Sequence, residues 1–174
     1  MGAAAILTAA TAGPGWADTT CASVAAAMMR VPDQPGVHQR TMLREPSNIE
    51  MEAFLLPDAM YVRGSDKAPW NRLPIDQGER RAMARKALEA APLSECTGPT
   101  TGLDGAMPVQ IYRYRQPDLL NPGSFTASSL WIGGDGLPRR FVISETSYQT
   151  MEYGHFSPPT DLTPSKPQRT KPAR

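Results

Sequence analysis

Residues 130–140 read Leu-Trp-Ile-Gly-Gly-Asp-Gly-Leu-Pro-Arg-Arg, and residues 133–136 in their middle form the strongest turn signal in the chain. Glycine and aspartate accept the positive φ angles of a tight β-turn at little cost. The turn lies between two runs that have the composition of short strands. We therefore predict a β-hairpin here, with strands over residues 125–132 and 139–145.

Six further extended runs, separated by turns, predict a longer antiparallel sheet. Two of them complete a four-strand meander around the hairpin, and the other four lie upstream. In chain order the six runs are residues 37–43, 49–56, 59–63, 70–73, 107–115 and 148–156. Residues 97–106, which are rich in glycine and threonine, are predicted to form a loop between the two groups.

Two helices are predicted, one ahead of each group of strands. The first covers residues 18–29 and has a single apolar stripe at helical spacing. That stripe consists of Cys21, Val24, Ala25 and Met28. The second covers residues 80–91 and follows Asp76 and Glu79, which have the spacing of a capping box. Its apolar face consists of Met83, Ala87, Leu88 and Ala91.

The order helix, four strands, helix, four strands predicts an α+β fold. One antiparallel sheet of about eight strands, covered on one face by two α-helices, would bury the apolar faces of all these elements together. The chain has 174 residues, of which 40% are hydrophobic, which suits a single domain with a modest core over residues 18–161.

Charge is unevenly distributed along the chain. Residues 162–174 carry four of the 18 lysine and arginine residues, none of the 17 acidic ones, and three prolines. This composition predicts a disordered basic tail, with at most weak contact to an anionic membrane surface. The remainder has a small net negative charge, so we predict no nucleic-acid partner.

Residues 1–17 are small and apolar, carry no charge and end in Gly-Trp-Ala. This pattern is typical of a signal-peptide h-region followed by an A-x-A-like cleavage site. The basic n-region is missing, which allows a true start further upstream. The alternative, a buried N-terminal helix, would be broken by Pro14. We therefore predict a signal peptide and a protein located in the periplasm or secreted.

Cys21 and Cys96 are the only cysteines. In an oxidising compartment an isolated pair in a small domain usually bonds, so we predict a disulfide that links the two helical regions. Without export, two unrelated buried thiols are the better interpretation. Lipidation of Cys21 is not expected, because Asp18, Thr19 and Thr20 occupy positions where that signal needs small apolar residues.

Three local motifs, together with the order of the elements, resemble the LolA/LolB-like periplasmic lipoprotein carriers. They are Met-Tyr-Val-Arg-Gly at residues 60–64 followed by Trp-Asn-Arg-Leu-Pro at 70–74, the hairpin at 130–140, and Tyr-Gly-His-Phe at 153–156 before two prolines. The resemblance implies a half-barrel, in which a curved sheet and its covering helices enclose a cavity for acyl chains. No functional residue of that family matches a position here, so the resemblance implies the fold and not the activity.

The sequence contains no recognisable arrangement of catalytic or metal-binding residues. His38 and His155 are the only histidines and lack the spacing of a zinc site, and no Gly-x-Ser-x-Gly motif is present. Glu50 and Glu52 share a strand face, as exposed acids on a sheet commonly do. We therefore predict a protein that is not an enzyme and has no cofactor and no metal.

Methionine is the unusual component, with nine residues in the chain. Methionine side chains adapt to irregular shapes, so they suit a flexible apolar binding site, although core gap-filling beneath the helices is the more common explanation on the same physical grounds. We predict that an apolar group binds against the concave sheet through side chains of the predicted strands. These are Met42, Met51, Phe54, Met60, Trp70 and Trp131.

Two functions remain open. The first is a non-catalytic periplasmic binding protein for a lipid-like group or the acyl chain of a lipoprotein. The second is a protein-interaction module without a small ligand, such as an inhibitor, accessory protein or envelope-complex subunit, which would use a sheet edge, residues 97–106 or the tail. An open apolar cavity between helices and sheet would favour the first, and a groove filled by side chains the second.

Overall fold

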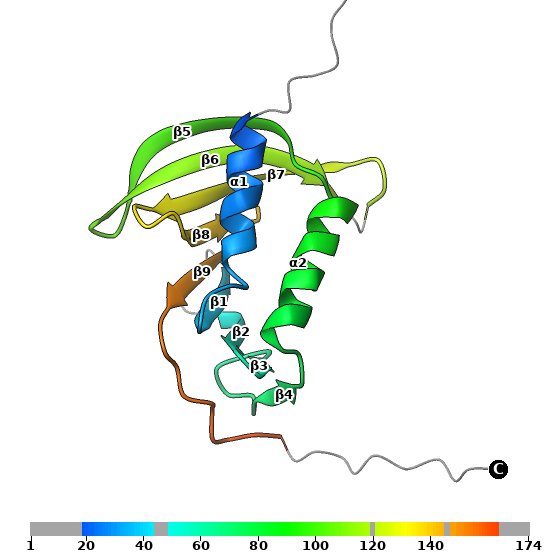
Figure 1. Cartoon of the computed structure of the whole chain (residues 1–174), viewed down its shortest axis with the longest axis vertical. Coiled ribbons are helices and arrows are strands. Elements are labelled where there is room, and N and C mark those ends of the chain that lie inside the picture. Colours follow the sequence, from blue (N-terminus) through cyan, green and yellow to red (C-terminus); the bar gives the residue numbers. More distant parts are fainter. Residues whose placement is uncertain (1–18, 44–48, 119–120, 145–146, 164–174) are drawn as a thin grey trace, which may run out of the picture.

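The computed structural model describes residues 19–43, 49–118, 121–144 and 147–163, in which two helices lie on one face of a nine-stranded sheet (Figure 1). The helices are α1 (Thr19–Arg30) and α2 (Gln77–Ala90). The strands are β1 (Val37–Leu43), β2 (Ile49–Leu56), β3 (Ala59–Arg63), β4 (Asn71–Leu73), β5 (Ser94–Asp104), β6 (Met107–Pro117), β7 (Phe125–Gly133), β8 (Pro138–Val142) and β9 (Ser147–Tyr153). The α+β class and the two helices on a single face are confirmed. The proposed signal peptide lies outside the described residues.

All neighbouring strands pair antiparallel, in the order β4-β3-β2-β1-β9-β8-β7-β6-β5. Each group of strands forms a meander. The two groups are joined because β1 pairs with β9 along its whole length, from Val37 opposite Tyr153 to Leu43 opposite Ser147. The first and last strands described therefore lie side by side within the sheet.

The strand β5 was not predicted from the sequence. The expectations of a loop over residues 97–106 and of about eight strands were wrong, because β5 is a ninth strand that pairs with β6 at the edge of the sheet. Most of its side chains are exposed, and its register shifts between Ser94 and Thr97 and again between Thr97 and Thr100. An edge strand of this kind lacks the alternation of apolar side chains on which strand prediction depends.

The helix α1 packs on the part of the sheet that contains β5 and β6. Val24 is fully buried and Ala27 is 6% exposed, in a cluster that includes Leu130 of β7. The predicted disulfide is present and joins Cys21 of α1 to Cys96 of β5, with 5.2 Å between their Cα atoms. It therefore fastens the start of α1 to the edge strand.

The helix α2 begins with the predicted capping box. The Asp76 side chain accepts a hydrogen bond from the backbone N–H of Glu79, and the Glu79 side chain accepts one from the backbone N–H of Asp76. The predicted apolar face of the helix, in contrast, is buried only at its C-terminal end, at Ala91. Met83 is 53% exposed, and Arg80 is the one buried residue of the helix. The helix therefore covers the sheet without filling the space beneath it.

We expect the substitution Asp76→Ala to lower the free energy of unfolding by about 1 kcal/mol, because the first turn of α2 loses the acceptor that satisfies one of its N–H groups. Urea denaturation followed by circular dichroism measures this loss. Asp76→Ser can still accept the hydrogen bond and should recover most of it. An unchanged unfolding free energy in Asp76→Ala would show that other contacts hold the start of the helix.

At the C-terminal end of the described chain, residues next to β4 are held by backbone contacts. Leu162 forms a parallel bridge with Trp70, and the N–H of Thr163 donates to the carbonyl of Trp70 at 2.7 Å. The structured part of the chain thus reaches two residues past position 161, into the segment that the sequence assigned to the tail. The rest of that segment lies outside the described residues.

Candidate functional site: a methionine-lined cavity

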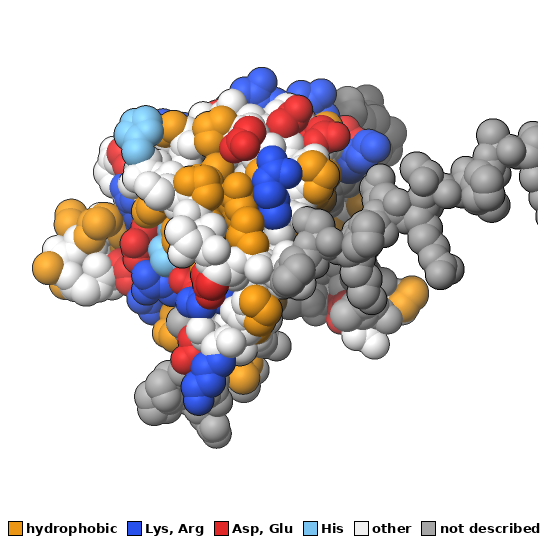
Figure 2. Space-filling model, turned by 90° about the horizontal axis from the view of Figure 1, so that it is seen from below, with side chains coloured by type: hydrophobic (Ala, Val, Ile, Leu, Met, Phe, Trp, Pro, Cys, Tyr) orange, Lys and Arg blue, Asp and Glu red, His pale blue; other side chains and the backbone are white. Residues whose placement is uncertain are grey.

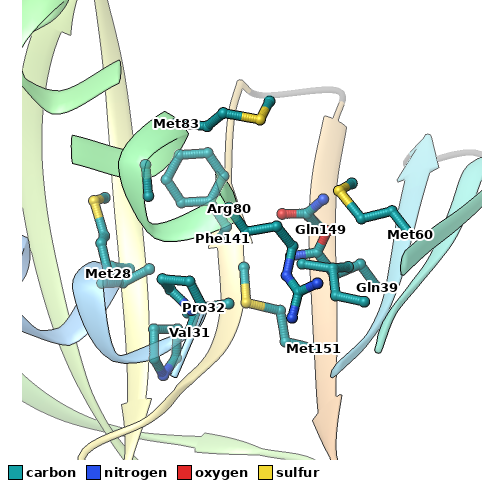
Figure 3. A pocket seen from close by; sticks show the side chains of 14 residues that line it. Met28, Val31, Pro32, Gln39, Met60, Arg80, Met83, Phe141, Gln149 and Met151 are labelled. Atoms are coloured by element: carbon teal, nitrogen blue, oxygen red, sulfur yellow. The ribbon is translucent and has the colours of Figure 1, made fainter. Parts of the chain in front are cut away.

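A cavity of about 300 Å³ lies between α1, α2 and the middle of the sheet (Figure 3). Its lining is mainly apolar, with Gln39, Arg80 and Gln149 as the polar members. This volume is at the lower end of the range of ligand pockets, which is roughly 300–1,000 Å³. The space therefore suits one apolar chain or ring rather than several.

The position of α2 explains why the space stays open. The side chains that α2 directs toward the cavity are Arg80, Met83 and Ala84. Ala84 is too short to reach the sheet, and Met83 is half exposed. On the sheet itself, the buried cluster under α1 and the buried cluster around Val37 and Leu55 are separate. α2 adds no buried side chain to either cluster, and the cavity lies between the two clusters beneath this helix.

Four methionines from four different elements line the cavity (Figure 3). They are Met28 of α1, Met60 of β3, Met83 of α2 and Met151 of β9. The unbranched thioether side chain has several rotatable bonds and adapts to the shape of what it contacts. A lining of this kind can accommodate apolar groups of different shape without movement of the backbone.

Arg80 is the one charged side chain in the lining, and it is 5% exposed. Its Nη1 donates hydrogen bonds to the carbonyl oxygens of Leu56 at 2.5 Å and Ile75 at 3.3 Å. Its Nε and Nη2 are buried and have no hydrogen-bond partner among the described residues. Burial lowers the pKa of Arg80, and the carboxylates of Asp58 and Asp76 oppose this shift. An arginine remains protonated at neutral pH, so the cavity wall carries a positive charge.

The structure does not bring the six proposed ligand-binding residues together. Met60 lines the cavity. Met51 lies on the same face of β2 as the cavity-lining Leu55, but its side chain is 43% exposed and lies outside the lining. The other four side chains lie on the face of the sheet away from the helices. These are Met42, Phe54, Trp70 and Trp131.

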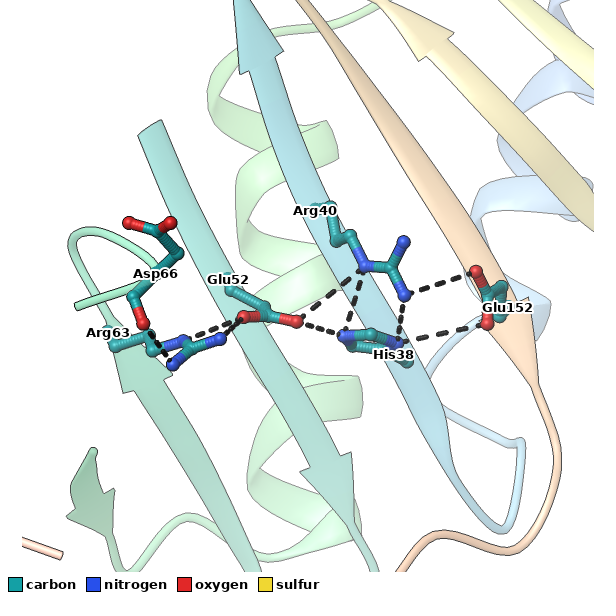
Figure 4. Close-up of polar contacts among 6 residues, drawn as sticks. All are labelled: His38, Arg40, Glu52, Arg63, Asp66 and Glu152. Atoms are coloured by element: carbon teal, nitrogen blue, oxygen red, sulfur yellow. Dashed lines mark hydrogen bonds and ion pairs between the residues drawn. The ribbon is translucent and has the colours of Figure 1, made fainter. Parts of the chain in front are cut away.

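The face away from the helices carries a charged and aromatic cluster (Figure 4). The His38 ring stacks on Phe54 with 4.2 Å between the ring centroids. Glu52, which is 6% exposed, accepts hydrogen bonds from His38 at 2.6 Å and from the Nε of Arg63 at 2.7 Å. Glu152 lies 3.8 Å from the other ring nitrogen of His38. These groups satisfy one another, so the arrangement serves to hold β1, β2, β3 and β9 together.

Phe54 and Trp131 have local partners on that outer face. Phe54 contacts the rings of Trp70 and Phe156, with centroid distances of 5.2 Å and 5.5 Å. The guanidinium group of Arg140 lies 5.0 Å from the ring centroid of Trp131. These aromatic side chains therefore pack against neighbouring side chains and do not face the cavity.

Sequence reasoning missed the residue that gives the cavity its charge. Arg80 precedes Met83 and Ala84 by three and four positions, so it extends the apolar face of α2 by one turn. A charged residue at the head of an apolar helix face is the signal that could have identified it. Met28 and Met83 were assigned to helix faces, and nothing in the sequence showed that those faces border an open space.

Other kinds of site find no support in the residues that the structure describes. Within residues 19–43, 49–118, 121–144 and 147–163, no three His, Cys, Asp or Glu side chains are placed to hold a metal ion. In the same ranges no helix combines the length and apolar character needed to cross a membrane. On the face seen in Figure 2, acidic and basic side chains are interspersed, with hydrophobic ones in small groups. That face has no continuous basic surface for a polyanion.

Comparison with known proteins identifies the class of fold. No protein-family model matches the sequence, and no curated protein matches it significantly. The open antiparallel sheet with helices on one face resembles that of the LolA/LolB-like half-barrels, so the predicted fold-level resemblance is confirmed.

Among solved structures, the chain is similar to the lipoprotein LppX of Mycobacterium tuberculosis, with a TM-score of 0.51 and 10% sequence identity. This likeness covers 85% of the present chain and 100% of LppX. LprF from Mycobacterium bovis aligns with a TM-score of 0.49 and 11% identity, over 85% of this chain and 98% of that one. At such low identity the likeness to LppX shows the fold alone.

Proposed function

We propose that this chain is a non-catalytic binding protein that holds one apolar group, such as a lipid acyl chain, in the methionine-lined cavity. The cavity itself carries the proposal, because a sheet-and-helix domain of this size normally fills its interior at close packing. An open apolar space lined by four adaptable methionine side chains is the arrangement expected for a binding site.

Export is the second part of the proposal. The Cys21–Cys96 disulfide supports a location outside the cytoplasm, because such bonds form and persist in oxidising compartments. We propose that residues 1–17 act as the export signal and that the domain works in the periplasm or after secretion. A lipid or lipoprotein in the envelope would then be its ligand.

Filling the cavity should weaken binding of an apolar ligand. We expect the purified wild-type domain to bind the uncharged fluorescent probe N-phenyl-1-naphthylamine at micromolar concentration, and Ala84→Trp to weaken this binding about tenfold or more. Ala84 lies in the lining, so an indole at this position occupies the space that the probe would use. Fluorescence titration measures both affinities.

Ala82→Trp is the matched control, because Ala82 lies on the exposed side of the same helix and outside the lining. It should bind the probe as the wild type does. Failure of the wild type to bind the probe would refute the proposed function. Equal binding by Ala84→Trp and Ala82→Trp would place the probe somewhere other than the cavity and would also count against it.

One observation favours the alternative of a protein-interaction module. Leu103 and Met107, on either side of the turn between β5 and β6, are 64% and 45% exposed. Figure 1 shows this hairpin extending past the neighbouring strands. A contact surface at this tip would be independent of the cavity. It becomes the preferred interpretation if the wild type binds no apolar probe.

A further inference from the structure

The buried guanidinium group of Arg80 indicates which kind of apolar ligand the cavity takes. Nη1 is occupied by the carbonyl oxygens of Leu56 and Ile75. The remaining donors, on Nε and Nη2, are buried without a partner in the described part of the chain. These two nitrogens form one edge of the planar group, which is the edge that pairs with a carboxylate or phosphate through two parallel hydrogen bonds.

The protein supplies no anion of its own at this edge. The nearest carboxylates that influence Arg80 are those of Asp76 and Asp58. Asp76 is engaged at the helix start by the N–H of Glu79. Asp58 is 71% exposed and lies 3.6 Å from Arg72. Neither hydrogen-bonds to Arg80, so its charge has no direct counter-ion among the described residues.

A buried arginine without a counter-ion is unfavourable, because this side chain cannot lose its proton to become neutral. Figure 3 shows Arg80 extending from α2 toward the sheet within the cavity. An acidic ligand in the cavity would remove the imbalance by pairing with the unsatisfied edge. Because both nitrogens are shielded from solvent, side chains next to them must shift to admit the acid group. The methionines of the same lining are well suited to such a shift.

We propose that the ligand is a single-chain amphiphile with an acidic head group, either a carboxylate or a phosphate monoester, whose head pairs with Nε and Nη2 of Arg80 while its chain occupies the methionine-lined cavity. This inference rests on the proposed function and makes it more specific. The small cavity volume fits one chain, and the absence of any acidic residue from the lining removes a source of repulsion. Arg80 is thus assigned as a specificity-determining residue.

Displacement of bound N-phenyl-1-naphthylamine tests the assignment. Palmitate, 1-palmitoyl-glycerol 3-phosphate and the uncharged methyl palmitate are titrated against the wild-type complex. We expect the better of the two acids to displace the probe at a concentration about ten- to a hundredfold lower than the ester, the range expected for hydrogen bonds to a charged group. Comparison of the two acids decides between a carboxylate and a phosphate head.

Substitution of the arginine provides the second measurement. In Arg80→Gln the preference for acids should fall to about twofold or less, while Arg80→Lys, which keeps the charge, should retain part of it. Arg85→Gln makes the same change on an exposed position of α2 and should leave the preference unaltered. Thermal unfolding of each variant confirms that it is folded. The preference for acid over ester is measured in the wild type itself, so it tests the proposal even if a variant fails to fold.

The outcomes separate this inference from the proposed function. Equal displacement by acid and ester in the wild type would overturn the role of Arg80 and leave an apolar binding site intact. A preference for acids that persists in Arg80→Gln would also overturn it, because another group would then recognise the head. Absence of probe binding in the wild type would remove both proposals together.

Discussion

Replacing Cys21 and Cys96 together by serine is expected to lower the free energy of unfolding by about 4 kcal/mol. The disulfide closes a loop with a sequence separation of 75 residues, and a loop of that size greatly restricts the unfolded chain. A loss of this magnitude is a large share of the roughly 5–15 kcal/mol that stabilises an ordinary domain. Urea denaturation, with and without a thiol reductant, measures it.

The same substitution should also weaken binding in the cavity. The disulfide fastens the start of α1, and the end of α1 contributes Met28 to the lining. The wild-type protein in reductant is the matched control and should reproduce the double variant. A loss below about 1 kcal/mol would mean that the bond restricts the unfolded chain much less than a loop of this length implies, which contradicts the expectation.

The substitution Glu52→Ala is expected to lower the free energy of unfolding by about 3 kcal/mol. Glu52 is buried and accepts hydrogen bonds from both His38 and Arg63, so its removal leaves these two donors facing an empty space (Figure 4). Breaking a buried ion pair by removing one partner costs about 3–5 kcal/mol, and the lower value applies because Arg63 is 19% exposed and recovers some hydration.

Glu152→Ala provides the comparison for that experiment. Glu152 belongs to the same network, but its side chain is 59% exposed. Exposed ion pairs contribute about 0–1 kcal/mol, so this variant should lose much less stability than Glu52→Ala. Equal losses in the two variants would show that burial of Glu52 is not the source of its effect.

The contribution of Glu52 should disappear in acid. Burial alone would raise the pKa of Glu52, but hydrogen bonds from His38 and Arg63 outweigh it and hold the pKa below its ordinary value of 4.5. The unfolded chain therefore takes up a proton on Glu52 at a higher pH than the folded protein does. The contribution is fully present above about pH 5 and is lost as the pH falls through 4.5 toward the lower folded-state pKa.

Comparison of the wild type with Glu52→Gln between pH 7 and pH 3 measures this dependence. The glutamine variant cannot titrate at this position, so the difference in unfolding free energy between the two proteins should shrink as the pH falls. A difference that stays constant over this range would contradict the lowered pKa.

Much of the fold could be predicted because its signals are local. The turn at residues 133–136, the capping box of Asp76 and Glu79 and the apolar stripe of α1 each depend on residues that are close in the sequence. The disulfide followed from the presence of just two cysteines. β5 was missed because an exposed edge strand with two register shifts carries no alternating pattern.

The site was harder to predict because it depends on which face of each element meets which neighbour. Strand alternation showed that Phe54 and Leu55 lie on opposite faces but did not show which face the helices cover. Phe54 and Trp131 were therefore placed in the binding site, whereas the structure places them on the far side. The open space under α2 depends on packing between distant elements, and Met83 at a helix face is equally compatible with a filled core.

The pairing of β1 with β9 has a consequence for how the polypeptide acquires its shape. One edge of β1 pairs with β9, which lies more than a hundred positions later in the chain. Contacts between residues so far apart in the sequence form slowly. At a synthesis rate of 5–20 residues per second, the backbone donors and acceptors on that side of β1 wait roughly 5–20 s for their partner. During this interval the N-terminal meander has an open edge that can pair with a second molecule. This edge is closed only when residues 147–153 are available to complete the sheet.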